Sequence, residues 1–539
     1  MLRKLTRPLC ALALLTMASP SLADTHIDNV DGISISRDGK VDRFTGMVID
    51  DSGYITELLD FGDRPSRPIE YRVNGKGRVI MPGFVDAHVR LMDLGLSTLV
   101  LDLSDTRSLE EGLATIRAYS AAHPDRPWIV GRGWNVERWG LGRYPKAADL
   151  DQAEATRPVW ILDSDGEAGW ANNAALKAAG ITAKTPDPAL GRLLRFGPDR
   201  QPAGVLIGSA REMVERAVPP PLPDDLALAL HNAQQLLLAR GITAIADMGT
   251  SIEDWMAYRR AGDAGRLHMR IMAYADTMPT ILLIGGSGPT QWLYEDRLRM
   301  GGINLVLDGA LATRGSLLKA EYADKAVLGL PELSGTQMRN LISRASLGGF
   351  QVAITAHGDE AAADALSAIG ELSGDYAGER RWRIEHLGVL DPADIPQFAA
   401  HSVIASMQPL HAQSEEPIAL ERLGEARLAS TKGWSGLSAA GANVVFGSYA
   451  PAVPADPLAA IALSSQSPGM SREQALAAYT AGAAFAGFAE SHFGSLAPGE
   501  RADFVFLSAD PLKVSVEQLP QIEVLETWIA GQRVYAAGQ

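Results

Sequence analysis

Between residues 226 and 486, short apolar runs alternate with longer segments whose apolar residues recur every three or four positions. Short apolar runs are typical of buried strands, and the longer periodic segments predict amphipathic helices. The predicted strands are Ile242–Met248, Arg270–Ala275, Ile303–Asp308, Gln351–Thr355, Trp382–His386, Val403–Met407 and Val444–Gly447; the predicted helices include Leu226–Arg240, Glu360–Leu372 and Ser471–Ala486. In the last helix, Ser471 and Gln474 have the spacing of a capping box. Regular alternation of strand and helix predicts an α/β fold with a closed, TIM-like (β/α)8 barrel.

Both ends of the chain have a different pattern of apolar and polar residues. Short β segments separated by turn residues occur at Ile33–Ile35, Met47–Ile49, Tyr71–Val73, Ala502–Leu507 and Val524–Tyr535. We expect the two ends to pair into one small β domain. Roughly residues 120–220 fit the alternation poorly and are rich in proline and tryptophan, so we predict an insertion that covers the barrel mouth. Its tryptophans could stack on a ligand or pack into a core or lid.

Residues 1–23 have the pattern of a cleaved secretory signal peptide, which predicts a periplasmic or secreted protein. Arg3, Lys4 and Arg7 precede the apolar run Leu9–Met17, and small residues follow up to Ala23. The single cysteine, Cys10, lies inside this segment. The processed chain would therefore have no disulfide, thiolate zinc site or cysteine nucleophile.

Composition narrows the class of protein. The chain has 539 residues, of which 46% are hydrophobic, enough for a large core and for more than one domain. The formal net charge is -15, and the absence of a long basic run argues against nucleic-acid binding. No segment after the signal has the length of an uninterrupted membrane helix. A small molecule is the expected ligand or substrate, and the oligomeric state stays open.

The stretch Val79–Leu91, which reads VIMPGFVDAHVRL, combines a buried strand with polar residues at its C-terminal end. In a barrel of parallel strands, that end carries the chemistry. Because side chains alternate along a strand, His88 and Arg90 are expected to point the same way.

This stretch resembles the opening of the amidohydrolase superfamily, Pro-Gly-x-(Ile/Val)-Asp-x-His-x-His, and the whole processed chain is similar to the YtcJ-like (amidohydrolase-3) branch. The segments that carry the resemblance are Trp128–Trp134, Arg157–Val159, Trp170–Leu176, Asp308–Ala310, Gly358–Ala361, Arg383–His386, Met407–Pro409, Ala478–Thr480 and Gly494–Asp503. The resemblance implies a β-sandwich built from residues 24–80 plus 488–539 around a barrel at 81–487.

The resemblance also implies a catalytic metal, but most of the implied ligand positions are changed. His88 and His386 keep the family residue, whereas the second His of His-x-His is Arg90. The other changed positions are Asn304 for a Lys, Thr355 for a His, Glu167 for a His in the insertion, and Tyr449 for the Asp that serves as ligand and general base.

A hydrolytic zinc site needs about three protein ligands and an open position for water. His88 and His386 alone are too few; His357, His411 or Glu167 could complete a rebuilt site with one zinc-like divalent ion. A guanidinium about 5 Å from such an ion would be repelled by roughly 6 to 7 kcal/mol at an effective dielectric near 20. The residues therefore favour a metal-free ancestral site. Arg90 could instead bind an anion, or pair with Asp86, Asp308 or another acid.

The choice between a rebuilt metal site and a metal-free site leads to two functional hypotheses. The first is hydrolysis of carbon–nitrogen bonds other than peptide bonds, with an altered site built on His88, His386 and His357. The second is a non-catalytic periplasmic ligand-binding relative with an anion site around Arg90. In both, Arg90, His357, Glu167 and Tyr449 are the expected ligand contacts, and no catalytic residue is assigned. Ser448 lacks the pattern of a nucleophile elbow, and no dinucleotide fingerprint occurs.

Overall fold

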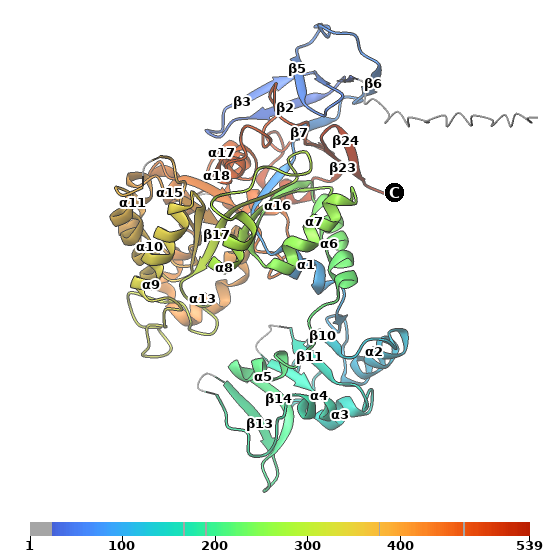
Figure 1. Ribbon diagram of the computed structural model, residues 1–539, viewed down its shortest axis with the longest axis vertical. Helices are drawn as coiled ribbons and strands as arrows, with labels where there is room; N and C mark the ends of the chain where they lie inside the picture. Colours follow the sequence, from blue (N-terminus) through green and yellow to red (C-terminus); the bar gives the residue numbers. More distant parts are fainter. Residues whose placement is uncertain (1–23, 165–167, 189–190, 377, 467–468, 539) are drawn as a thin grey trace, which may run out of the picture.

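A nearly closed barrel of parallel strands forms the centre of the computed structural model, which describes residues 24–164, 168–188, 191–376, 378–466 and 469–538 (Figure 1). Its eight strands run in the order β21-β20-β19-β18-β17-β16-β15-β8. Their bounds are β8 Phe84–Val89, β15 Ile242–Thr250, β16 Arg270–Ala275, β17 Leu298–Val306, β18 Gln351–Ala356, β19 Arg383–His386, β20 Ile404–Met407 and β21 Asn443–Phe446. The predicted fold class is confirmed.

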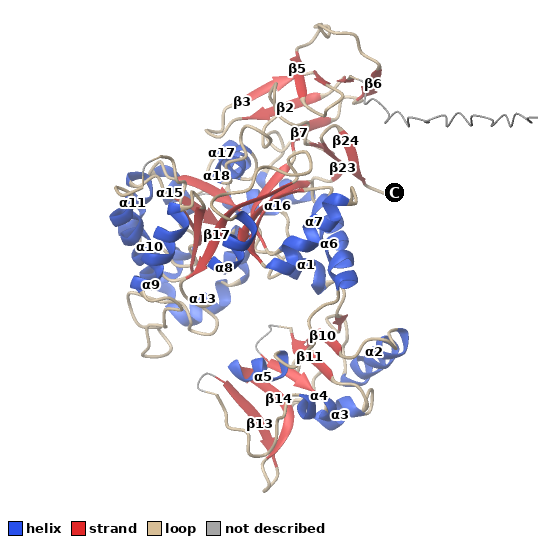
Figure 2. Ribbon diagram, in the orientation of Figure 1, coloured by secondary structure: helices blue, strands red, loops and turns tan. Residues whose placement is uncertain are grey.

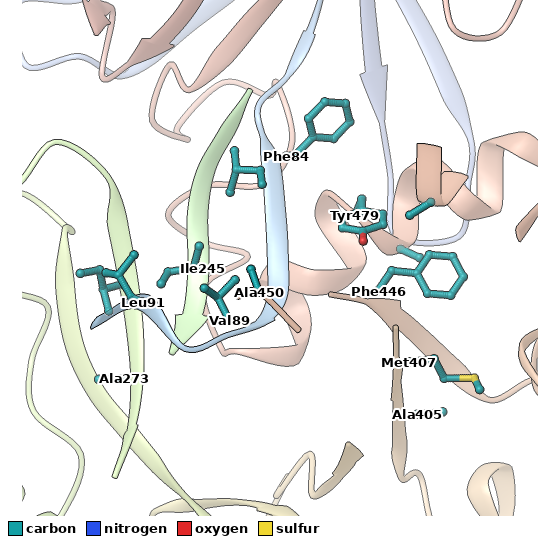
Figure 3. Packing of buried hydrophobic residues seen from close by; sticks show 14 of the residues in the cluster. Phe84, Val89, Leu91, Ile245, Ala273, Ala405, Met407, Phe446, Ala450 and Tyr479 are labelled. Atoms are coloured by element: carbon teal, nitrogen blue, oxygen red, sulfur yellow. The ribbon is translucent and has the colours of Figure 1, made fainter. Parts of the chain in front are cut away.

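The last strand meets the first just beyond the C-terminal end of β21. The Tyr449 amide donates to the His88 carbonyl at 2.8 Å, and the Arg90 amide donates to the Ala450 carbonyl at 3.0 Å. Figure 3 shows Phe84 and Val89 of β8 between Ile245 on one side and Phe446, Ala450 and Tyr479 on the other. This apolar packing fixes the strand from which His88 projects.

Helices cover the outside of the barrel (Figure 2). They are α1 Leu91–Ser97, α6 Pro223–Leu238, α7 Ile252–Asp263, α8 Met278–Gly285, α9 Gly335–Leu347, α10 Asp359–Leu372, α11 Ile395–Ala400, α12 Pro409–Ser414, α13 Glu416–Leu423, α14 Glu425–Leu428, α15 Trp434–Ala439, α16 Pro457–Ser464, α17 Arg472–Ala478 and α18 Ala481–Ala486. The capping box at Ser471 and Gln474 is present. The helix predicted to continue to Ala486 is broken at Thr480, because the Tyr479 carbonyl accepts from the Val85 amide of β8 at 2.7 Å.

The two chain ends form two sheets at one end of the barrel. One has the order β5-β4-β1-β6 and the other β24-β23-β22-β7-β2-β3. Their bounds are β1 Thr25–Asp28, β2 Asp31–Ile35, β3 Val41–Phe44, β4 Gly46–Ile49, β5 Ile55–Leu59, β6 Tyr71–Asn74, β7 Val79–Pro82, β22 Phe504–Leu507, β23 Val524–Ile529 and β24 Gln532–Ala536. Strand β7 pairs antiparallel with β22, placing Met81 opposite Val505. A buried ion pair between Arg270 and Asp503 joins this sandwich to barrel strand β16.

A separate lobe lies between α1 and α6 in the sequence and below them in Figure 1. Its sheet has the order β13-β14-β12-β11-β10-β9. Its elements are β9 Leu101–Asp102, α2 Leu109–Ala122, β10 Ile129–Trp134, α3 Ala147–Asp151, β11 Val159–Asp163, β12 Ala168–Ala171, α4 Asn173–Ala178, β13 Gly191–Phe196, β14 Gln201–Gly208 and α5 Glu212–Glu215. The lobe begins earlier than the insertion predicted at 120, because the two-residue strand β9 leaves no periodic pattern. It contacts α6 through an Arg126–Asp225 ion pair of 2.5 Å.

The tryptophans of the lobe pack into its own cores. Trp134, Trp160 and Trp170 are at most 2% exposed, and Trp139 contacts the Trp170 ring edge-on with a centroid distance of 6.1 Å. Core packing is therefore the observed use of these rings. Within the described ranges, helices are too short or too polar to cross a bilayer.

Candidate functional site

His88 lies at the C-terminal end of β8 and is fixed by a buried chain of charges. Its Nδ1 is 2.9 Å from Glu385 Oε2, and the other oxygen of that carboxylate pairs with Arg383. Arg383 also donates to the Ala87 carbonyl at 2.7 Å. Burial opposes ionisation of Glu385, but Arg383 and His88 still hold its pKa below the usual value. One ring nitrogen of His88 is thus committed to Glu385.

At the same end of the barrel, the imidazoles of His357, His386 and His411 lie close together beside the Tyr449 ring. The His386 ring centroid lies 4.0 Å from that of His357, 4.8 Å from that of His411 and 5.0 Å from that of Tyr449. The Tyr449 ring is also 5.0 Å from the His88 ring. Strands β8, β18, β19, β20 and β21 therefore direct these five rings to one place.

Most of these imidazoles have a nitrogen without a hydrogen bond. Among the described residues, Nδ1 of His357, His386 and His411 is buried and has no hydrogen-bond partner. Buried polar nitrogens are rarely left in this state, so each one calls for a ligand, an ion or a water. The Glu415 carboxylate is close to two of these rings: its Oε2 lies 3.5 Å from His411 Nδ1 and 3.9 Å from His386 Nε2.

Burial keeps the imidazoles of His386 and His411 neutral. Desolvation, followed by the neighbouring imidazoles, lowers the pKa of His386 well below its usual value. Desolvation also lowers the pKa of His411 to about 4 and raises the pKa of the Glu415 carboxyl. Neutral imidazole is the form that binds a metal ion. Near neutral pH, His386 and His411 therefore present lone pairs rather than positive charge.

Backbone geometry positions two of these side chains. His386 has φ 78° and Tyr449 has φ 66°, both in the left-handed region that non-glycine residues seldom adopt. His357 is held differently, because the buried Asp308 carboxylate accepts from the amides of His357, Gly358 and Leu317, each at 2.8 Å. The loops after β17 and β18 are therefore tied together by the Asp308 carboxylate.

Two of the changed family positions now satisfy each other. Thr355 Oγ1 donates to Asn304 Oδ1 at 2.9 Å, and Thr355 is 4% exposed. Neither side chain is a usual ligand for zinc, which prefers imidazole, thiolate and carboxylate. The ancestral donor set, with Tyr449 in place of the acid, therefore does not fit a metal.

Arg90 does not share the orientation of His88. Strand β8 ends at Val89, and Arg90 is the N-cap of α1, with φ −108°, so the alternation of the strand stops before it. Its side chain is 57% exposed, and its Nε lies 2.6 Å from Asp93 Oδ2. The acid that it meets is thus Asp93 rather than Asp86 or Asp308. Solvent exposure and this partner weaken the repulsion that was expected to exclude a metal.

The residues that could hold a metal overlap in part with those predicted, which included His386 and, as a candidate, His411. Among the described residues, one group of His, Asp, Glu and Cys side chains, His386, His411 and Glu415, brings ligand atoms within 4.8 Å of one another. His88 is not part of this group; Glu385 holds its Nδ1, which leaves Nε2 as its only possible ligand atom. Sequence reasoning missed Glu415, although its i, i+4 spacing from His411 places both on one helix face. Glu167 and residues 1–23 lie outside the described residues.

Asp86, from the same motif as His88, is fully buried on β8. Its Oδ1 accepts from the amides of His88 at 3.0 Å and Ser448 at 2.9 Å, while its Oδ2 has no hydrogen-bond partner among the described residues. Burial raises the pKa of this carboxyl to about 6. Asp86 therefore joins β8 to the loop that carries Tyr449.

Comparison with known proteins agrees with this architecture. The chain is 30% identical over 495 residues to the Arabidopsis thaliana protein LONG AFTER FAR-RED 3, covering 86% of this chain and 83% of that protein. It is 30% identical over 498 residues to Bacillus subtilis (strain 168) YtcJ, covering 87% and 91%, and 24% identical to an N-substituted formamide deformylase of Arthrobacter pascens, covering 84% and 88%.

Among solved structures, an uncharacterised metal-dependent hydrolase from Pyrococcus furiosus superposes with a TM-score of 0.76 at 26% identity, covering 91% of this chain and all of that one. These relatives support a hydrolase that acts on a small molecule. The model of the amidohydrolase family matches residues 73–535. The chain belongs to the amidohydrolase family.

Proposed function

We propose that this protein hydrolyses a carbon–nitrogen bond other than a peptide bond, in a small amide-type substrate, at a site altered from the family pattern. The observation that carries the proposal is the group of buried imidazoles at the barrel mouth, three of which have an unpartnered Nδ1. Such atoms at the C-terminal end of barrel strands are typical of a functional site rather than of a packed core. The relative named as an N-substituted formamide deformylase supports this class of bond.

The residues of the cluster have different roles in the proposed reaction. A divalent ion, when bound, polarises the substrate carbonyl and lowers the pKa of a water molecule. His88, held by Glu385 through Nδ1, presents its other ring nitrogen for hydrogen bonding to substrate or water. Burial raises the pKa of the Tyr449 hydroxyl, so this group stays protonated near neutral pH and is a hydrogen-bond donor, not a general base.

The test is an amine-release screen with N-substituted formamides and other small amides, on purified protein supplied with zinc, cobalt or manganese. We expect turnover that falls by about 100-fold or more in His386→Ala, the scale on which direct participants act. His231→Ala, which changes an exposed histidine of α6, is the matched control. Absence of turnover across the screen in folded, metal-supplied protein would contradict the proposal.

The alternative is a ligand-binding relative without catalysis. It is favoured by the Asn304–Thr355 hydrogen bond and by Tyr449 at the position of the family's acid. In that case small carboxylates should bind tightly without being changed, and Arg90→Ala should abolish their binding in calorimetry. Unchanged affinity in that variant would remove Arg90 from the ligand site, as its pairing with Asp93 suggests.

Export to the periplasm belongs to the same proposal. The basic and apolar pattern of residues 1–23 supports it. N-terminal sequencing of protein from a periplasmic extract should begin at Asp24. Uncleaved protein confined to the cytoplasm would contradict this localisation.

A further inference from the structure

We propose that His386, His411 and Glu415 bind a single divalent metal ion, displaced from the position that the family's ligand pattern implies. This inference deepens the proposed function and rests on it for the role of the ion. The site combines one ligand that the family pattern contains, His386, with two that it does not, His411 and Glu415.

Distances within the group are those of a site that needs little rearrangement. Tetrahedral zinc with ligands at about 2.1 Å places neighbouring ligand atoms about 3.4 Å apart. The Glu415 carboxylate lies 3.5 Å from the His411 ring nitrogen and 3.9 Å from that of His386. All three ligand atoms lie within 4.8 Å of one another. Side-chain movements of about 1 Å would bring the widest pair to the tetrahedral spacing.

The local structure holds these ligands on two elements. His386 ends β19, where its left-handed backbone directs the ring into the mouth. His411 lies on α12, and Glu415 is the residue that joins α12 to α13. Residues four apart on a helix share a face, so His411 and Glu415 approach His386 together.

The chemistry of the three groups suits zinc, cobalt or iron. Two imidazoles and one carboxylate form a ligand set of catalytic metal sites and leave a position open for water. Both imidazoles are neutral at neutral pH, as metal binding requires. The carboxylate would compensate part of the charge of the ion.

Neighbouring groups explain why the ion would not occupy the ancestral position. Asn304 and Thr355 are bonded to each other and offer no ligand that zinc prefers, and Tyr449 stands where the family pattern has an acid. His357 lies beside His386, but its Nδ1 faces Asp308 at 3.4 Å. We therefore place His357 next to the metal ligands and outside the set.

Metal binding is measured directly, by zinc titration calorimetry and elemental analysis of the chelator-treated full chain, and by the visible absorption of bound cobalt. We expect one ion per wild-type chain. His411→Gln and Glu415→Gln should each weaken binding by more than about 100-fold, beyond the effect of losing an outer partner of a ligand. Their circular dichroism should match the wild type.

Two controls sharpen the assignment. His231→Gln removes an exposed imidazole of α6, and Thr355→Val changes the ancestral ligand position; both should retain one ion and the cobalt spectrum. A wild-type protein that binds no ion overturns the site. Full binding in both His411→Gln and Glu415→Gln, or loss of binding in Thr355→Val, overturns it as well. If either glutamine variant is misfolded, a shift of the cobalt spectrum in Glu415→Asp decides whether this side chain is a ligand.

The experiments distinguish a failure of the proposed metal site from a failure of the proposed function. An ion that is bound as assigned, in a protein that hydrolyses no amide, would leave the metal site standing and contradict the proposed function. Amide hydrolysis that survives with full metal content in both glutamine variants would support the function and overturn the site.

Discussion

The barrel mouth has two sides that treat their buried polar groups differently. On the partnered side, Asn304 bonds Thr355, and Arg383 and Glu385 fix His88. On the open side, His357, His386 and His411 keep buried nitrogens without hydrogen bonds among the described residues.

The difference shows how a binding site can be recognised without a bound ligand. A buried hydroxyl and an amide give a stable structure when they bond each other, as Thr355 and Asn304 do. Keeping buried polar atoms unpaired costs about 1 to 3 kcal/mol each. Such unpaired atoms are tolerated where a bound ligand or ion pairs with them. We therefore infer that the open side is the functional one.

The largest expected effect is on the partnered side. Glu385→Ala would leave the Arg383 guanidinium buried without its charge partner and should lower the free energy of unfolding by about 3 to 5 kcal/mol in urea denaturation. The matched control is Glu379→Ala, which removes a 58% exposed partner of Arg381 and should change stability by less than about 1 kcal/mol. Similar small effects in both variants would mean that Arg383 finds another partner.

The open side should make the metal-free protein sensitive to mild acid. The pKa of His411 is lowered to about 4, against about 6.5 in the unfolded chain. Between these values the unfolded state binds more protons, so stability decreases as pH falls through this window, by about 3 kcal/mol from this group. Urea denaturation of chelator-treated protein at pH 7 and pH 4.5 measures it, and His411→Asn should flatten the dependence. An unchanged slope in the variant would assign the effect to other groups.

Asp86 should act in the opposite direction. Its pKa is raised to about 6, so between about pH 4 and 6 the folded state binds more protons and stability falls as pH rises. Asp86→Asn keeps an acceptor for both amides and removes the charge. We expect it to stabilise the protein by up to about 3 kcal/mol at pH 8 and to have little effect at pH 4. Equal effects at both pH values would show that the carboxylate is not the cause.

The smallest effect is expected from the hydrogen bond between the two changed family positions. Thr355→Val keeps the shape of the side chain and removes the bond to Asn304, which should lower the free energy of unfolding by about 1 kcal/mol. A loss several times larger would indicate that the partnered side organises the open side as well.

Much of the barrel could be predicted from local pattern. Strand β16 has the predicted bounds, and β18, β19 and β20 differ from the predictions by one residue at an end. Strand β17 begins at Leu298, earlier than predicted, because Gly301 and Gly302 interrupt its apolar run. These elements were predictable because burial on both faces requires an apolar run wherever a barrel strand passes.

The candidate site was predictable only in part. His88, His357, His386 and Tyr449 were identified, and the structure brings their rings together. Arg90 was expected to share the face of His88, but the strand ends one residue before it. The pairing of Thr355 with Asn304, and the use of Glu385 and Glu415, depend on contacts across the barrel that no local pattern contains.

The sequence by itself determined the fold class and the strand that carries His88, because apolar periodicity and residue identity are local properties. The tertiary structure alone decided which polar atoms are paired and which are left open. Glu385 reaches one nitrogen of His88 from β19, across the barrel from β8, whereas Glu415 lies beside His386 at the end of a helix that follows β20. Partner choice at the mouth depends on how parallel strands bring their C-terminal ends together, since that geometry joins residues hundreds of positions apart.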